Sequence, residues 1–280
     1  MLLDAWIPVL ATGVLGLLIG SFLNVVIYRL PKMQDREWAE ACATANGQEL
    51  PETETFNLFL PRSRCQKCDH QIRWYQNIPV LSYIFLRGKC SACSTPISLR
   101  YPMVEVATGL LFAWCGWRWG LTPTAAVWCL FAALLVTMAL IDWDTTYLPD
   151  ILTLPLLWAG LIASALHWIP VPLADAVWGA VAGYTSLWLV YWVFKLLTGK
   201  EGMGFGDFKL FAALGAWFGW QALVPMVLIA SVIGSIIGIG MKLRNTLRDG
   251  IHVPFGPFLA LGGITAMILG PQAILRAVGL

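Results

Sequence analysis

Long apolar stretches recur along this sequence, and they constrain its fold more than any other feature does. Hydrophobic residues make up 58% of the 280 residues and charged residues only 12%, whereas a soluble domain is usually about 25% charged. A helix needs about 20 apolar residues to cross the hydrocarbon core of a bilayer. We therefore expect an all-α polytopic membrane protein. The net charge of +2 gives no indication of nucleic acid as a partner.

About eight transmembrane helices are expected. The sixth apolar stretch is short and almost continuous with the seventh, so we expect the sixth helix to be tilted or partly buried in protein. The first stretch is too long for the apolar core of a signal peptide, and no small-residue cleavage site follows it, so no cleavable signal is expected. The approximate bounds of the eight helices are 6–27, 102–119, 125–141, 151–168, 173–197, 208–220, 222–241 and 254–275.

The distribution of Lys and Arg predicts the orientation in the membrane. With eight spans, 16 of the 18 basic residues fall on one side, and only Arg118 and Arg276 fall on the other. Because loops rich in Lys and Arg stay in the cytoplasm, the large loop between the first two spans is expected to be cytoplasmic, with both termini outside the cytoplasm. The expected domains are a first transmembrane helix (1–28), a cytoplasmic domain (29–101) and a seven-helix membrane domain (102–280).

Four cysteines in the large loop have the spacing of a metal site. Cys65 and Cys68 form one C-x2-C pair, and Cys90 and Cys93 form a second. Two such pairs can place four thiolates at the corners of a tetrahedron, which suits Zn²⁺, and with no position left for water a structural role is expected. A disulfide pair is the weaker alternative, because disulfides are rare in the cytoplasm. His70 is a further candidate that could replace one cysteine.

Three aspartates lie in the segment IDWDTTYLPD, between the third and fourth spans, with no basic residue among them. Asp142 ends the third span and is the one expected nearest to membrane depth, where ionisable side chains are by default functional candidates. Asp144 lies further into a hydrated turn. Asp150 is well placed as the N-cap of the next helix. Asp142 is therefore the main candidate for chemistry.

A second acidic site follows a glycine-rich segment, GKEGMGFGDFKL. Asp207 comes after Gly204 and Gly206 and directly before the sixth span, on the same side of the membrane as Asp142. The glycines permit a tight turn and the close approach of another chain, although an ordinary flexible loop is the alternative. Two neighbouring carboxyls do not easily both ionise, so one can take a proton from water while the other donates to a scissile carbonyl. The pattern favours two-aspartate proteolysis, although it does not show that the acids meet.

These motifs resemble those of the type IV prepilin peptidases (prepilin leader peptidase/N-methyltransferase). The resemblance covers nearly the whole chain and includes the segments GSFLNVVIYRLP, NIPVLSY, RYPMVE and PFGPFLA besides the cysteine and aspartate motifs. It implies that Asp142 and Asp207 are the catalytic pair of an aspartic endopeptidase in the bacterial inner membrane. It also implies cleavage of the basic leader of type IV prepilins and type II secretion pseudopilins.

The same resemblance implies a second activity, N-methylation of the new N-terminal residue with S-adenosylmethionine. The sequence offers no separate methyltransferase domain or cofactor fingerprint, so this activity rests on the resemblance alone. The cytoplasmic tetracysteine domain and the spans beside it are its expected location, since the cofactor is cytosolic. The expected partners are prepilins, pseudopilins and membrane lipid.

Three further residues are expected to matter. Glu105, at the start of the second span, needs a partner or a wet cavity. It either contacts the substrate amine or the cofactor, or is satisfied by Arg100 or the helix N-terminus. Gly88 either shapes the second cysteine pair or lies near the cofactor. Asn24, in the first span, is expected to form a hydrogen bond across helices.

Two other functions remain open on the sequence. Intramembrane acids also serve as proton relays, so a non-enzymatic transporter or assembly scaffold with a zinc-bound loop is the main alternative. An intramembrane protease of the presenilin type shares the glycine-and-aspartate turn. The tetracysteine loop and the RYPMVE segment argue against that second alternative.

Overall fold

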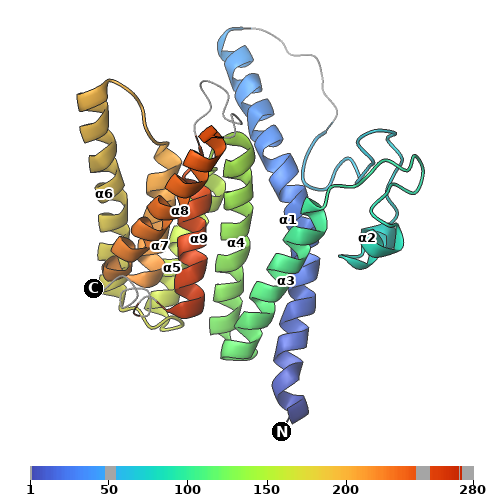
Figure 1. The fold of residues 1–280 in the computed structure, drawn as a ribbon, viewed down its shortest axis with the longest axis horizontal. Helices are drawn as coiled ribbons and strands as arrows, with labels where there is room; N and C mark the ends of the chain where they lie inside the picture. The colour runs from blue at the N-terminus through green and yellow to red at the C-terminus, as the bar shows by residue number, and fades with distance from the viewer. Residues whose placement is uncertain (1, 48–54, 244–252, 271, 273–280) are drawn as a thin grey trace. The chain divides into compact units, whose positions relative to one another are not determined.

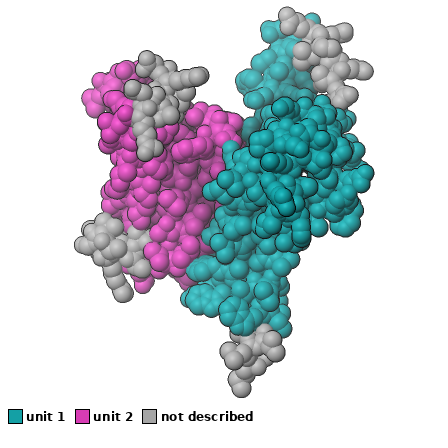
Figure 2. Space-filling model, turned by 45° about the vertical axis from the view of Figure 1, so that its right-hand side comes forward, with its two compact units in different colours: residues 1–129 teal, residues 130–280 magenta. Residues whose placement is uncertain are grey.

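The computed structural model describes residues 2–47, 55–243, 253–270 and 272. In this part of the chain the regular structure is helical, with two isolated β-bridges and no strand. The chain forms two compact units, residues 1–129 and residues 130–280 (Figure 2). The boundary falls within a helix, since the fourth helix contributes residues to both units.

Each predicted span corresponds to one helix (Figure 1). Four of the helices are long and apolar enough to cross a membrane, and α5 and α9 are shorter apolar helices. The predicted all-α polytopic membrane protein is therefore confirmed. The helices are α1 (Leu2–Ala45), α3 (Arg100–Trp119), α4 (Pro123–Thr145), α5 (Asp150–Ala165), α6 (Leu173–Thr198), α7 (Phe205–Phe218), α8 (Leu223–Leu243) and α9 (Gly256–Leu269), with a short α2 (Leu81–Phe85) and 3-10 turns at Trp74–Asn77 and Trp220–Ala222.

In unit 1, α1 and α3 pack closely against each other. At Gly20 of α1, a Cβ would lie only 2.8 Å from the Cα of Glu105 on α3. Small residues of this kind let membrane helices approach closely. Asn24 Nδ2 donates a hydrogen bond to Tyr101 O at 3.1 Å, so the predicted bond across helices is confirmed. The loop that contains the four cysteines connects these two helices.

The first helix is longer than the predicted span. α1 has 44 residues, a length of about 66 Å at 1.5 Å per residue, and it continues from the apolar stretch into charged sequence up to Ala45. Arg29, which follows the predicted span, is buried and donates to Asn57 O at 2.8 Å and to Pro61 O at 2.6 Å. The continued helix therefore ties down the start of the described loop.

In unit 2, α7 is the central helix. Almost every residue of α7 from Asp207 onward is buried, which explains why its sequence is apolar on all sides. The indole N–H of Trp217 donates to Leu156 O on α5 at 2.9 Å, and Gly215 meets Gly179 of α6 in a backbone-to-backbone contact. The prediction that this short span is buried in protein is confirmed.

Candidate active site and metal centre

Asp142 lies in the last turn of α4, because the helix continues past the predicted end of the third span to Thr145. The residue is only 4% exposed, and its Oδ2 accepts a hydrogen bond from the backbone N–H of Gly256 at 3.0 Å. Gly256 is the first residue of α9, and N–H groups in the first turn of a helix have no partner within that helix. The start of α9 therefore holds one oxygen of a buried acid.

Gly256 has no room for a side chain. A Cβ there would lie 2.6 Å from Asp142 Oδ2 and 3.0 Å from Leu148 Cδ1. Sequence reasoning assigned Gly256 no role of its own, although a signal was present. Gly256 precedes Pro257 at the start of the last apolar stretch, and proline in a first helical turn marks a helix N-terminus.

Asp207 lies in the first turn of α7, directly after the glycine turn. The residue is 6% exposed, and its backbone N–H donates to Gly204 O at 3.2 Å. Its Oδ1 is buried and has no hydrogen-bond partner among the described residues. Because burying a polar atom without a partner is costly, this oxygen is the atom at which we expect water or a substrate group to bind.

Leu148 contacts both acidic segments. It lies in the link between α4 and α5 and is 4% exposed. A Cβ added to Gly206 would lie 2.6 Å from the Cβ of Leu148. A Cβ added to Gly256 would lie 3.0 Å from the Cδ1 of Leu148. One side chain thus touches the residue before Asp207 and the residue bonded to Asp142. Through Leu148 the folded chain brings together the segments of two acids that are 65 positions apart in the sequence.

The two glycines of the predicted turn differ in their surroundings. Gly206 is packed against Leu148 and has no space for a Cβ. At Gly204 the nearest atom to a Cβ, Asp207 Oδ2, is 3.9 Å away, and its φ of −83° is open to any residue. Only Gly206 is therefore required to be glycine by the space around it.

The other two acids of the IDWDTTYLPD segment are exposed. Asp144 lies in the last turn of α4. The prediction that Asp150 is an N-cap is wrong, because Pro149 occupies that position and Asp150 is the first residue of α5. Asp150 instead pairs with Lys209 at 2.6 Å. Since Lys209 follows Asp207 by two residues, this ion pair ties the first turn of α7 to the first turn of α5.

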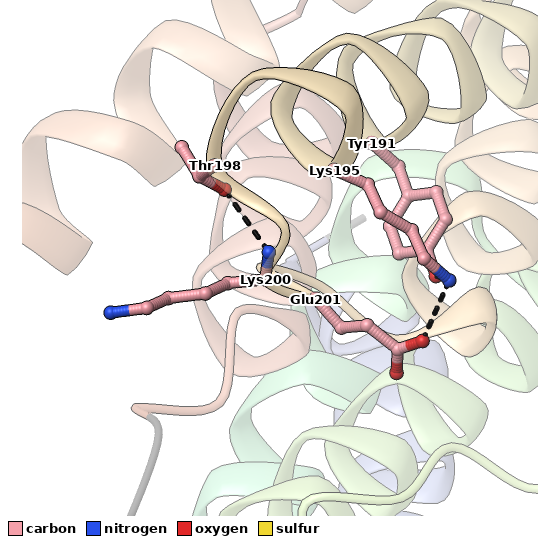
Figure 3. A network of polar contacts seen from close by, with 5 residues as sticks. All are labelled: Tyr191, Lys195, Thr198, Lys200 and Glu201. Atoms are coloured by element: carbon pink, nitrogen blue, oxygen red, sulfur yellow. Dashed lines mark hydrogen bonds and ion pairs between the residues drawn. The ribbon is translucent and has the colours of Figure 1, made fainter.

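A polar network holds the glycine-rich loop against the end of α6 (Figure 3). Lys195 Nζ donates to Glu201 Oε1 at 2.8 Å and to Tyr191 Oη at 3.2 Å. The backbone N–H of Lys200 donates to Thr198 Oγ1 at 3.3 Å. The hydrogen bond from the Lys195 ammonium lowers the pKa of Glu201. The loop before Asp207 is thus fastened at its start.

Aromatic rings fasten the same loop at its other end. The ring of Tyr191 packs against Phe205 and Phe208, with centroid distances of 5.4 and 5.7 Å. These two phenylalanines flank the Gly206-Asp207 pair, and Phe208 is fully buried. Tyr191 therefore links the polar network of the loop to the turn that carries the acid.

The four predicted cysteine ligands gather into one cluster in the tetracysteine domain of unit 1. Their sulfur atoms all lie within 4.8 Å of one another, and Cys65 Sγ lies 3.8 Å from Cys93 Sγ. Four sulfurs at about 2.3 Å from a zinc ion would be separated by roughly 3.8 Å. The hydrogen bond with Thr95 Oγ1, at 3.1 Å, lowers the pKa of Cys93 to about 6. These thiols fit a tetrahedral metal ion, and His70 is not part of the cluster.

The two cysteine pairs are held by the same backbone arrangement. In the first, the N–H of Cys65 donates to His70 O, and the N–H of Asp69 donates to Cys65 O. Asp69 has a positive φ of 52°, which tightens the turn around the sulfur atoms. Each feature recurs 25 positions later in the equivalent residues, which are Cys90, Thr95 and Ser94.

Glu105 is buried near the start of α3, and its partner lies in the loop. Its Oε2 accepts a hydrogen bond from the backbone N–H of Val80 at 2.8 Å, a partner that the sequence analysis did not anticipate. Val80 has a φ of 59°, which is strained for a β-branched residue. Glu105 therefore stabilises a strained backbone next to α2. Contact of Glu105 with the substrate or cofactor stays a prediction.

Gly88 lies in a tight turn directly before the second cysteine pair. Its φ is 66°, and its N–H donates to Tyr83 O at 2.9 Å. A Cβ would lie 2.8 Å from Tyr83 Oη. Gly88 thus shapes this part of the domain, and its contact with a cofactor stays a prediction.

The chain matches two family models. The Bacterial Peptidase A24 N-terminal domain matches residues 14–119, and the Type IV leader peptidase family matches residues 129–239. The first match contains the four cysteines, and the second contains both buried aspartates. No solved structure matches the chain.

The chain is also similar along most of its length to proteins named prepilin leader peptidase/N-methyltransferase. The proteins of that name from Stutzerimonas stutzeri and Pseudomonas aeruginosa are each 52% identical to it, over 94% of this chain and 91% of their own length. The one from Neisseria gonorrhoeae is 50% identical over 90% of this chain and 87% of its own length. On these matches, the chain belongs to the type IV leader peptidase family.

Proposed function

We propose that this chain cleaves the leader peptide from type IV prepilins and type II secretion pseudopilins, with Asp142 and Asp207 as the catalytic acids. The same chain then methylates the new N-terminal amine. The observation that carries the proposal is the pair of buried aspartates on α4 and α7, whose segments both pack against Leu148 within unit 2. The relatives' shared name supports both activities.

Cleavage follows from two carboxyl groups that share one proton. The ionised group takes a proton from a water molecule, whose oxygen attacks the scissile carbonyl carbon, while the protonated group donates to the carbonyl oxygen. A proton then passes to the leaving nitrogen as the C–N bond breaks. Gly256 holds Asp142 Oδ2, and Asp207 Oδ1 has no partner within the described chain, so the two acids differ in what they can bind.

The proposed orientation places both acids near the cytoplasmic face of the bacterial inner membrane. The tetracysteine loop is then cytoplasmic, and both termini lie outside the cytoplasm. The bias of basic residues supports this arrangement. It suits a substrate whose basic leader stays in the cytosol while its apolar helix lies in the bilayer. We divide the chain into a first transmembrane helix (1–28), a tetracysteine domain (29–101) and a membrane peptidase domain (102–280).

Zinc is the metal that we propose for the tetracysteine cluster. Four cysteine sulfurs are typical of structural zinc sites, and their separations suit tetrahedral coordination. The ion would contribute to folding of the domain. With four protein ligands it would have no position for water, so no role in leader cleavage is assigned to it.

S-adenosylmethionine would supply the methyl group as an electrophilic carbon. We place its binding in the tetracysteine domain, where a shallow surface hollow is lined in part by Arg62 and Arg64. Guanidinium groups match the carboxylate of the cofactor. Replacing both arginines by glutamine is expected to reduce methylation and leave leader cleavage intact.

Mass spectrometry of a prepilin reconstituted with the enzyme and S-adenosylmethionine tests the proposed function. The wild type should remove the leader and add one methyl group, whereas Asp142→Asn and Asp207→Asn should leave the precursor whole. Asp144→Asn is the matched control, because Asp144 is exposed in the same turn as Asp142, and it should cleave. Cleavage by folded Asp142→Asn or Asp207→Asn protein would contradict the two-aspartate mechanism and point to another protease design, whereas failure of the wild type to cleave would favour a transporter or scaffold.

A further inference from the structure

An exposed apolar surface lies on the tetracysteine domain. Leu81, Ile84 and Phe85 of α2 are 53%, 63% and 81% exposed, and Trp74, in the neighbouring 3-10 turn, is 81% exposed. The three residues of α2 have i, i+3, i+4 spacing and so share one face of the helix. We call these four residues the α2 face. In water, a group of large apolar side chains like this usually marks an interaction site.

Tyr83 anchors α2 to the rest of the domain. Its Oη donates to Ile97 O at 3.4 Å, whereas Ser82 Oγ makes an exposed local bond to Ile78 O at 2.7 Å. Tyr83 also packs against Gly88. The helix is therefore held through Tyr83, and its apolar face is turned outward. This is the reverse of the arrangement in a helix that covers a water-soluble core.

The α2 face lies beside a membrane helix and not beyond its end. Val80, which immediately precedes α2, donates to Glu105, more than one turn inside α3. In Figure 1, α2 lies alongside the α1–α3 pair. On α3, Met103 and Leu110 are each 66% exposed, as expected of side chains that face lipid. Glu105 also packs against Gly20, within the apolar stretch of α1 that is long enough to cross a membrane. The apolar surface of α2 thus starts beside that stretch.

Exposed basic side chains stand on both sides of this surface in the sequence. Arg73 precedes Trp74, and Arg87 and Lys89 follow Phe85. Apolar side chains bordered by Lys and Arg are typical of segments that lie in the membrane interface. The cytoplasmic leaflet carries anionic lipids, which attract such basic residues. The charges therefore match a lipid surface.

We propose that the α2 face inserts into the cytoplasmic leaflet and docks the tetracysteine domain on anionic lipid. The proposal goes beyond leader cleavage and methylation, and it depends only on the proposed orientation. Docking would hold the domain at the cytoplasmic surface of the membrane. The competing occupant is the apolar helix of the prepilin itself.

Site-specific photocrosslinking in the full chain tests the proposal. A benzophenone amino acid replaces Phe85, and the zinc-loaded protein is reconstituted in vesicles of phosphatidylethanolamine and phosphatidylglycerol. Leu110 is the positive control on α3. Trp38 is the negative control, because it is 74% exposed on the charged continuation of α1. After irradiation, mass spectrometry should find lipid adducts at position 85 at a yield comparable to position 110 and many-fold above position 38.

Two outcomes would contradict insertion of the α2 face into lipid, and a third would contradict the choice of anionic lipid. Position 85 would give no lipid adduct while position 110 does, or added prepilin would replace the lipid adduct by a crosslink to prepilin. Exchanging phosphatidylglycerol for phosphatidylcholine should reduce the adduct at position 85 and leave the adduct at position 110 unchanged. Equal yields in both lipids would exclude recognition of the anionic headgroup. None of these outcomes depends on Asp142 or Asp207. Failure of the peptidase proposal would instead show in the prepilin cleavage assay, so the two proposals can fail independently.

Discussion

Two glycines, Gly206 and Gly256, set the distance between the segments that carry the two acids. Gly206 and Gly256 both pack against Leu148, one next to Asp207 in the sequence and the other bonded to Asp142. Added atoms at either glycine would push its segment away from Leu148. Since the other segment also rests on Leu148, the two carboxyl groups would separate. At this scale, the proposed catalysis depends on the absence of side chains at these glycines as much as on the acids.

Replacing Gly206 by alanine is expected to abolish most leader cleavage. The new methyl group would meet Leu148 Cβ at 2.6 Å, so α7 must shift, and a misplacement of about 1 Å can reduce a rate roughly 100-fold. Gly204→Ala is the matched control and should retain activity, because its Cβ would meet no atom closer than 3.9 Å. The measurement is kcat for leader cleavage in proteoliposomes. Equal activity of the two variants would contradict the role of Leu148.

The Asp150–Lys209 ion pair predicts a second effect at this scale. Lys209→Met and Asp150→Asn should each lower kcat with little change in KM, because the pair positions the first turn of α7 without touching substrate. Partly exposed pairs contribute about 0.2–1 kcal/mol, so a double-mutant cycle should give a coupling energy in that range. The charge-reversed double variant, Asp150→Lys with Lys209→Asp, should recover part of the lost activity. A change confined to KM would instead indicate binding of the basic leader.

Among the helices, the crossing of α6 and α7 decides where the second acid is held. Gly179 and Gly215 bring the two backbones into direct contact, and Tyr191 on α6 packs around the turn that carries Asp207. The burial of α7 on all sides follows from this contact together with the contacts of α5. A helix of 14 residues is short for a membrane span, and its neighbours in unit 2 supply the apolar surroundings that lipid gives to longer helices.

Gly179→Ala is expected to destabilise this crossing. Its Cβ would collide with the carbonyl oxygen of Gly215, and overpacking of this kind typically costs about 1–3 kcal/mol. Gly240→Ala on α8 is the matched control, because nothing lies within 4 Å of its added Cβ. Thermal unfolding in detergent should show a lower midpoint for Gly179→Ala only. Identical midpoints for the two variants would mean that close contact between α6 and α7 at Gly179 does not contribute to the stability of the protein.

At the scale of the whole molecule, the two compact units agree with the two family models. Unit 1 covers residues 1–129 and contains the cysteine cluster, and unit 2 covers residues 130–280 and contains the acids. The models match residues 14–119 and 129–239. The cysteine cluster and the acid pair are therefore built by different units, which suits two activities that act in succession on one substrate.

Loss of the metal is expected to act first on the tetracysteine domain. Cys90→Ser should lose bound zinc, lower the thermal stability of the protein, and reduce methylation more than leader cleavage, because structural zinc contributes to folding. Cys42→Ser is the control, since Cys42 lies on α1 outside the cluster, and it should keep the metal. Metal analysis, thermal unfolding and product masses are the measurements. Loss of zinc without any effect on stability or activity would exclude a structural role.

Much of the protein follows from the sequence alone. The length and apolarity of the helices place them in a bilayer, because no other environment satisfies so many consecutive apolar residues. The C-x2-C spacing predicts the cluster, because each pair forms a local turn, and the motif resemblance singles out Asp142 and Asp207. The sequence left open whether the polar stretch after the first span is helix or coil, since a charged helix carries no apolar signal, and the structure continues α1 to Ala45.

Only the tertiary structure decided how the site is assembled. Gly256 and Asp142 are 114 positions apart in the sequence, and Asp150 and Lys209 are 59 apart. Leu148 contacts Gly206 and Gly256, which are 58 and 108 positions away. Pairings over such separations leave no periodic trace, because each depends on how whole helices pack. Local patterns therefore identify the helices, the metal ligands and the acids. Packing alone determines which groups meet.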